Sequence, residues 1–163
     1  MKKDEKTNAL RLLSQKKIPF VSHDYTDSGA VSGPEVAAAL GEDPAKVFKT
    51  LVTTGKSGQH YVFVLPVSKE LDLKKAAAAV GEKNVAMLPQ KELLPLTGYV
   101  HGGCSPIGMK KLFPTVMDGR AEGQATVCLS GGRIGLQLEL APEDLRAIVP
   151  FTFADICVEE AEA

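Results

Sequence analysis

Residues 46–67 read "KVFKTLVTTGKSGQHYVFVLPV" and carry the strongest strand signal in the chain. The two halves of this stretch, 46–54 and 60–67, are rich in β-branched and aromatic residues, and the sequence TGKSGQ between them carries two glycines. Such runs on either side of a glycine turn are typical of an antiparallel hairpin. The first half also places Lys49 between apolar neighbours, where its ammonium group is expensive to remove from water.

Strand alternation gives Lys49 an ordinary interpretation. Successive side chains point to opposite faces, so Lys49 shares a face with Val47 and Leu51, and that face mixes charge with apolar surface. An edge strand accommodates this mixture, because its lysine can extend to solvent and discourage edge-to-edge pairing. From the pattern alone we therefore expect an edge strand.

Further elements surround the hairpin. Helical patterns cover 4–17, 35–40, 71–81, 88–95 and 141–149, and strand-like runs cover 20–25, 113–119, 125–132 and 134–140. Ser32 and Asp72 are suited to cap the helices that follow them, and Pro89 and Pro95 are expected to bound the fourth helix. Because strands and helices do not alternate as in βαβ units, the sequence predicts an α+β fold. We expect a mixed, mostly antiparallel, barrel-like sheet with surrounding helices.

The 163 residues are enough for one domain with a sizeable core and too few for two. We expect a single domain over 1–163, with frayed ends at 1–4 and 158–163. A hydrophobic share of 44% and a charged share of 24% are typical of a soluble globular protein. No apolar run has the length of a membrane span and no signal peptide is recognisable, so a cytoplasmic location without membrane contact is expected.

Composition also limits the chemistry. Cys104, Cys128 and Cys157 are isolated, which predicts neither a disulfide frame nor a zinc site, and no other pattern indicates a metal or a cofactor. The formal net charge of −1 argues against a broad basic surface for long nucleic acid. It leaves room for a local basic rim, for which Lys110 and Lys111 are the first candidates.

The loop "TGYVHGGCSPIGMKK", residues 97–111, is the second informative stretch. Its glycines and proline exclude a regular helix or central strand, yet Tyr99 and Ile107 make it too apolar for a floppy linker. Paired glycines allow a backbone to approach a ligand closely, although a tight structural turn is the commoner reason for such a pair. No dinucleotide or P-loop motif accompanies it.

Within this loop, His101 and Cys104 invite a nucleophile interpretation. A third, orienting group cannot be singled out, so a small packing residue is the preferred interpretation of Cys104. Ser130 stands at a strand end before two glycines, where it could bind a small ligand. His23 and His60 lie in strand-like runs and are expected to be surface or hydrogen-bonded histidines.

Taken together, several segments resemble one family. They are VFKTL at 47–51, LDLKK at 71–75, the loop at 97–111, SGG at 130–132 and FADI at 153–156. In this order they resemble the YbaK-type aminoacyl-tRNA deacylases, which are free-standing relatives of the editing domain of bacterial prolyl-tRNA synthetases. The resemblance runs from the opening helix to Ile156, and the lysine strand together with the glycine loop makes it specific.

The resemblance implies a mixed α/β barrel-like fold and removal of cysteine from Cys-tRNA(Pro). It makes Lys49 the essential lysine, pointing into a cleft rather than to solvent, and it makes Gly102 and Gly103 the loop glycines that close around the aminoacyl ester. The implied substrate-binding residues are Tyr25, Thr50, Ser105, Pro106, Ser130 and Gln137. The implied partner is the 3′ end of a mischarged tRNA, with prolyl-tRNA synthetase as a second candidate partner.

Two positions depart from the family pattern. Gln137 stands where members carry an acidic residue, and in the loop DSGAVSG, residues 27–33, Val31 or Ser32 stands near the place of an aromatic pocket residue. Both departures concern the preferred amino acid, for which alanine is an alternative, more than the reaction.

The sequence leaves the nucleophile and the activity itself partly open. The nucleophile is water or the thiol of the cysteinyl substrate itself. A binding module without hydrolytic activity, acting as an adaptor to a synthetase or a tRNA, is a second possible function. A hydrolase that depends on Cys104 is a third.

Overall fold

The computed structural model describes residues 6–159. The fraying expected at 1–4 and at 160–163 lies outside the described residues. Residue 158, which was also expected to fray, is described: its backbone N–H donates a hydrogen bond to the Glu70 carbonyl at 2.9 Å. No helix of the described part of the chain has the length and apolar character needed to cross a membrane.

The predicted hairpin is confirmed. It consists of β2 (Phe48–Gly55) and β3 (His60–Pro66), which pair antiparallel from Phe48 opposite Pro66 to Thr54 opposite His60. The other strands are β1 (Val21–Asp24), β4 (Val85–Met87), β5 (Thr115–Asp118), β6 (Val127–Ser130), β7 (Leu136–Leu140) and β8 (Phe151–Ala154). The sequence patterns did not predict the short strands β4 and β8.

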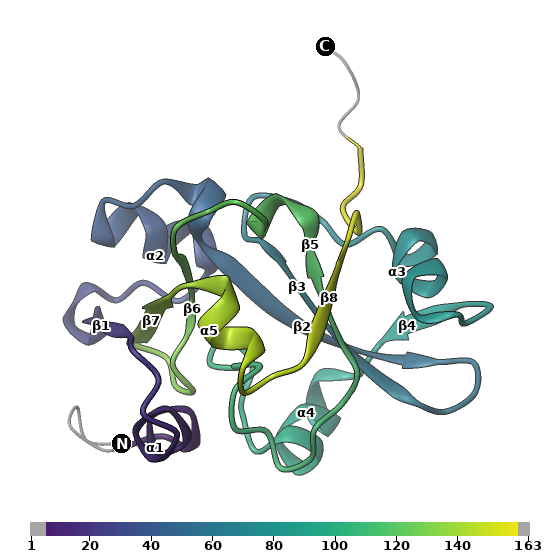
Figure 1. Ribbon diagram of the computed structural model, residues 1–163, viewed down its shortest axis with the longest axis horizontal. Coiled ribbons are helices and arrows are strands. Elements are labelled where there is room, and N and C mark those ends of the chain that lie inside the picture. Colours follow the sequence, from purple (N-terminus) through teal and green to yellow (C-terminus); the bar gives the residue numbers. More distant parts are fainter. Residues whose placement is uncertain (1–5, 160–163) are drawn as a thin grey trace.

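The strands form two sheets. One has five strands in the order β4-β2-β3-β5-β8, and the other has three in the order β1-β7-β6 (Figure 1). The smaller sheet and the pairs of β2 with β3 and β4 are antiparallel, whereas β5 is parallel to both β3 and β8. The α+β class and the mixed, mostly antiparallel pairing are confirmed.

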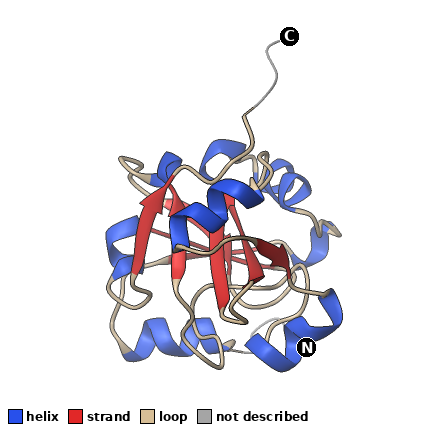
Figure 2. Ribbon diagram, turned by 90° about the vertical axis from the view of Figure 1, so that its right-hand side faces the viewer, coloured by secondary structure: helices blue, strands red, loops and turns tan. Residues whose placement is uncertain are grey.

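The strands of the described residues do not close into a barrel. The two sheets instead meet at a parallel bridge between Val47 and Cys128. Figure 2 shows the strands grouped together, with helices around their outside.

Helices flank both sheets. They are α1 (Asn8–Gln15), α2 (Gly33–Leu40), α3 (Leu73–Val80), α4 (Gln90–Thr97) and α5 (Pro142–Arg146), with short 3-10 turns at Thr26–Ser28, Pro44–Lys46 and Gly119–Ala121. The predicted caps are present: Ser32 and Glu35 form a reciprocal capping box at the start of α2, and the Asp72 carboxylate accepts from backbone N–H groups of α3.

The boundary expected at Pro95 was wrong, because α4 continues to Thr97. Proline removes a single N–H and does not prevent the next turn from closing. The Thr97 hydroxyl donates to the Leu93 carbonyl at 2.8 Å, and Gly98 then ends the helix in a left-handed conformation, with φ of 87°.

The β2–β3 hairpin separates two apolar cores. On one face, Phe48, Val52 and Val64 pack in a cluster that includes Leu129 and Leu138 of the smaller sheet. This packing holds the two sheets together. Because the strand alternates, Thr50 belongs to this face of β2.

The opposite face of the hairpin packs against α3. Phe63 and Leu65 of β3 lie in a second cluster with Ala76 and Ala77, and Leu51 is partly buried against it. Lys49 is paired with Leu65 in the β2–β3 register, so it lies on this second face.

Candidate active site

A cavity of about 470 Å³ lies where the start of β2 meets the smaller sheet. Four segments enclose most of it: residues 31–36 at the start of α2, residues 47–51 of β2, the loop at 101–104, and the facing ends of β6 and β7. Its lining includes six of the predicted site residues, namely Tyr25, Lys49, Thr50, Gly102, Ser130 and Gln137. Segments far apart in the sequence therefore meet at one hollow.

Lys49 is partly buried in this lining, and no hydrogen bond or ion pair to its ammonium is found among the described residues. Burial lowers the pKa of Lys49, and the negative charge of Glu70 offsets this only in part. The free protein therefore holds a cation that is short of compensating charge. An anion entering the cavity would supply that charge.

Two residues of the same lining each carry a buried polar atom without a partner among the described residues. These atoms are the Thr50 hydroxyl oxygen and the Gln137 side-chain oxygen. Gln137 is only 2% exposed, so water does not easily satisfy it. Buried polar atoms are nearly always paired, and exceptions call for an explanation such as a ligand.

The loop glycines have different surroundings. Gly102 lines the cavity with φ of +88°, a conformation that favours glycine. Gly103 faces the backbone of Arg133, which a Cβ atom would approach to 3.0 Å, and its N–H donates to the Val100 carbonyl. Gly102 thus borders the hollow, whereas Gly103 allows the loop to pack closely behind it.

Ser105 and Pro106 are buried outside the cavity lining. The Ser105 hydroxyl accepts from the Ile107 N–H at 3.2 Å, which stabilises the turn after the glycines. Of the residues in the lining, Ser130 accepts from the Gly132 N–H at 3.1 Å, and Tyr25 packs in a small cluster with Val36. A direct substrate contact by Ser105 or Pro106 stays a prediction.

Cys104 also lines the cavity, but its environment does not activate it. Burial raises the pKa of its thiol to about 12, so the thiol is protonated at neutral pH. His101 borders the same hollow and is exposed, and no hydrogen bond joins these two side chains in the described structure. The arrangement favours the packing interpretation of Cys104.

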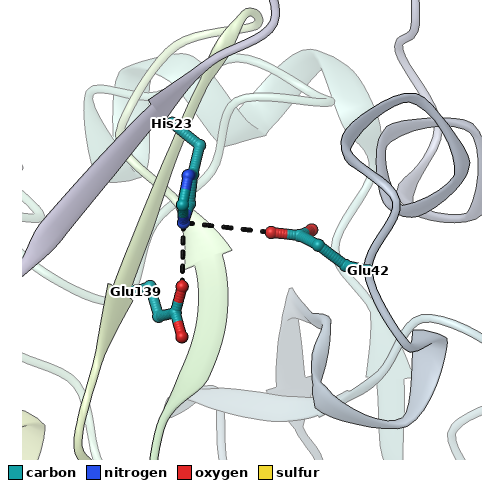
Figure 3. Close-up of side chains that lie close together, drawn as sticks. All are labelled: His23, Glu42 and Glu139. Atoms are coloured by element: carbon teal, nitrogen blue, oxygen red, sulfur yellow. Dashed lines mark hydrogen bonds and ion pairs between the residues drawn. The ribbon is translucent and has the colours of Figure 1, made fainter.

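Sequence reasoning missed a charged network behind the cavity. His23 of β1 lies between Glu42 and Glu139, with its Nε2 atom 2.8 Å from Glu139 and 4.0 Å from Glu42 (Figure 3). The Glu139 carboxylate also accepts from Lys46 at 2.8 Å and from Thr126. The hydrogen-bonded state expected for His23 is confirmed.

The ligand atoms of His23, Glu42 and Glu139 lie within 4.8 Å of one another, a spacing that could hold a metal ion. Both carboxylates are already engaged, however, because Glu139 accepts from Lys46 and Glu42 accepts from Gln137. We therefore describe the cluster as a hydrogen-bond network. No local pattern in the sequence indicated it, because Glu42 lies outside the strands β1 and β7 that carry His23 and Glu139.

The protein has a two-sheet α+β fold, and a lysine and a glycine loop meet at one cavity. Comparison with known protein families shows which class of protein has these features. The aminoacyl-tRNA editing domain family matches residues 28–148, so the chain belongs to that family. More particularly, it is 44% identical over 160 residues, 98% of each chain, to a protein of Enterococcus faecalis named EbsC and provisionally assigned as a Cys-tRNA(Pro)/Cys-tRNA(Cys) deacylase.

Two further likenesses point the same way. A proline–tRNA ligase of Pelobacter propionicus is 30% identical over 95 residues, which cover 58% of this chain and 16% of the ligase. A solved structure described as a proposed trans-editing enzyme for prolyl-tRNA synthetase superimposes with a TM-score of 0.82 at 25% identity, covering 96% of this chain and 100% of the other.

Proposed function

We propose that this protein is a trans-editing aminoacyl-tRNA deacylase that removes cysteine from mischarged Cys-tRNA(Pro). The observation that carries the proposal is the partly buried, unpaired ammonium of Lys49, within the described structure, in a cavity whose lining residues also carry two unpartnered polar atoms. Such a cavity suits a ligand that is both anionic and rich in hydrogen-bonding groups. The 3′ end of an aminoacyl-tRNA has both properties, and the high identity to EbsC supports the same activity.

In this proposal the chemistry needs no protein nucleophile. An aminoacyl ester is already activated, so the site has only to orient the carbonyl and stabilise the developing negative charge. Lys49 supplies the positive charge for this, by contact with the terminal phosphate or the ester oxygens. Gly102 allows the loop backbone to approach the ester, and Gly103 supports the loop. The protonated Cys104 thiol is not required.

Two nucleophiles can complete the reaction. Water can add to the carbonyl carbon, after which the bond to the ribose oxygen of the tRNA breaks, that oxygen takes a proton to become a hydroxyl, and free cysteine is released. Alternatively, the substrate's own sulfur attacks the carbonyl carbon, the same C–O bond breaks, the thiol proton passes to the leaving ribose oxygen, and a cyclic thiolactone is released. Product analysis distinguishes the two routes.

The size of the amino acid explains the need for such an enzyme. Cysteine and proline side chains are similar in bulk, so a synthetase pocket discriminates weakly between them and a second, hydrolytic site removes the error. We propose that the substrate is mischarged tRNA, that prolyl-tRNA synthetase can supply tRNA specificity, and that the protein acts in the cytoplasm, where translation occurs. Alanine is the other small amino acid to be tested.

The test is a deacylation assay on Cys-tRNA(Pro), Ala-tRNA(Pro) and Pro-tRNA(Pro), with wild type and Lys49→Ala. We expect hydrolysis of Cys-tRNA(Pro), spared Pro-tRNA(Pro), and a loss of at least about 100-fold in Lys49→Ala, since a charge aimed at a transition state contributes this much. Lys56→Ala, in the exposed hairpin turn, is the matched control and should retain full activity.

Cys104→Ser completes the design. Retained activity in this variant is expected, whereas its loss would indicate a thiol nucleophile of the protein. If no mischarged tRNA is hydrolysed although tRNA binding persists, the proposal fails and the protein is a binding module.

A further inference from the structure

The Gln137 side chain lies between the cavity and the charged network. It lines the cavity from β7, and its Nε2 atom donates a hydrogen bond to Glu42 Oε1 at 2.8 Å. Glu42 itself does not belong to the cavity lining. The Gln137 amide is therefore the connection between the hollow and a carboxylate behind it.

This hydrogen bond fixes which end of the amide faces Glu42. An ionised carboxylate can only accept hydrogen bonds, so the NH₂ end of Gln137 must point to Glu42. The other end, Oε1, is buried and has no partner among the described residues. Glu42 thus leaves the acceptor end of the amide, and not its donor end, as the unpartnered end of a residue that lines the cavity.

Glu42 is itself held in place. Its side chain is only 11% exposed, and its second oxygen lies 3.7 Å from the Cys128 thiol and 4.0 Å from His23 (Figure 3). His23 is in turn bonded to Glu139, which accepts from Lys46. The orientation of the Gln137 amide is therefore supported by a connected network, and not by a single flexible side chain.

We propose that Glu42 is a positioning residue that holds the Gln137 amide so that Oε1 accepts a hydrogen bond from the α-ammonium group of the aminoacyl ester. This rests on the proposed function. An ammonium group has three strong donors and a positive charge, whereas a thiol is a weak donor, so the ammonium matches a lone buried acceptor better. The contact recognises a feature that every aminoacyl ester has, and it is separate from selection for the side chain.

Two stable analogues of the aminoacyl terminus test this. One is 3′-(L-alanylamino)-3′-deoxyadenosine, and the other is its 3′-propionylamino counterpart, which lacks only the amino group. Calorimetric titration should show that wild type binds the alanyl analogue on the order of tenfold more tightly, as expected for a hydrogen bond to a charged group. Gln137→Leu should abolish this preference.

Glu42→Gln should abolish it as well, because an amide at position 42 no longer dictates the orientation of Gln137. In the double variant Glu42→Gln/Gln137→Leu the preference should be no lower than in Gln137→Leu alone, since Glu42 acts only through Gln137. Glu143→Gln removes an exposed carboxylate of α5 and should keep the wild-type preference. Thermal melts monitored by circular dichroism confirm that each variant is folded.

Three outcomes would overturn the inference. The first is equal binding of the two analogues by wild type. The second is a Glu42→Gln variant that loses thermal stability but keeps the preference for the alanyl analogue. The third is an effect of either variant that is seen only with a cysteinyl analogue of the same kind, which would assign the acceptor to the thiol. The deacylation assay remains separate. If the protein hydrolyses Cys-tRNA(Pro) but binds the two analogues equally, only this inference is refuted. If it does not hydrolyse Cys-tRNA(Pro), the proposed function is refuted, and the binding preference for the alanyl analogue still tests the Gln137 contact.

Discussion

Lys49 and Thr50 point from opposite faces of β2, yet both line the same cavity. On the side of β2 away from β3, β4 pairs only with residues 53–55 and the bridge to Cys128 is at Val47. Residues 48–51 therefore have no strand partner on that side in the described structure, and the cavity lies against them. This unpaired stretch of β2 brings a cation and a hydroxyl group to one ligand site.

Replacing Lys49 with methionine should keep or raise stability while removing activity. The Lys49 pKa is lowered by burial, so the folded state binds this proton less tightly than the unfolded state does. Stability is therefore reduced at pH values below the folded pKa and increases as the pH rises through it, up to the unfolded value of 10.5.

Urea unfolding at pH 7 measures this effect. We expect Lys49→Met to be equal to wild type or more stable by up to about 1 kcal/mol, because an apolar side chain of similar length replaces a desolvated charge. A variant that is clearly less stable than wild type would show that the ammonium stabilises the free protein.

Thr50→Val should lower activity without lowering stability. Valine has nearly the shape of threonine and removes a buried hydroxyl that has no partner in the described structure, so unfolding free energy should change by less than about 1 kcal/mol. If the hydroxyl binds the ester or ribose, kcat/KM should fall roughly 10-fold. The exposed Thr152→Val, on β8, is the control, and unchanged kcat/KM in Thr50→Val would exclude a substrate contact.

Gly102→Ala and Gly58→Ala form a matched pair. Both glycines have positive φ, +88° and +92°, so each substitution should cost about 1 kcal/mol or more of stability. Only Gly102 borders the cavity, where a new Cβ would also lie 3.4 Å from Ile134. We expect similar melting temperatures and a selective loss of deacylation in Gly102→Ala; equal activity in the two variants would argue against a role for the loop backbone.

The network around Glu139 should stabilise the protein except in acid. Hydrogen bonds from Lys46, Thr126 and His23 lower the pKa of Glu139 to about 2 from 4.5. A lowered carboxyl pKa means that its stabilisation is fully present above pH 4.5 and is lost as the pH falls from 4.5 towards 2.

Glu139→Gln should therefore be less stable than wild type at pH 7, by on the order of 1 to 3 kcal/mol. The difference should shrink when urea unfolding is repeated at pH 4 and pH 3. A difference that stays constant over this range would mean that the Glu139 carboxylate is not selectively stabilised in its ionised form.

Local signals in the sequence predicted much of the fold. The hairpin followed from its composition and its glycine turn, and α2 and α3 followed from Ser32 and Asp72, whose capping bonds are present. Strand β4, with three residues, is too short to show alternation. Pro95 misled because a single proline near the end of a helix removes one hydrogen bond and does not force the helix to stop.

The sequence predicted some residues of the candidate site and missed others, depending on whether a residue gives a local signal. Lys49 and Gly102 stand out because their residue types conflict with their local surroundings, and the structure places both at the cavity. The contact of Gln137 with Glu42 gives no such signal, since it joins residues 95 positions apart and depends on how the loop after α2 packs against β7. Their separate residue types are ordinary, and only the tertiary arrangement makes them informative.

The bridge between Val47 and Cys128 has a consequence for biosynthesis. The cavity is completed by the ends of β6 and β7, so a nascent chain has no finished site until residues up to about 140 have left the ribosome. The nascent chain would therefore be inactive towards the charged tRNAs that are used in its own translation. Its activity would begin only when β6 and β7 have docked.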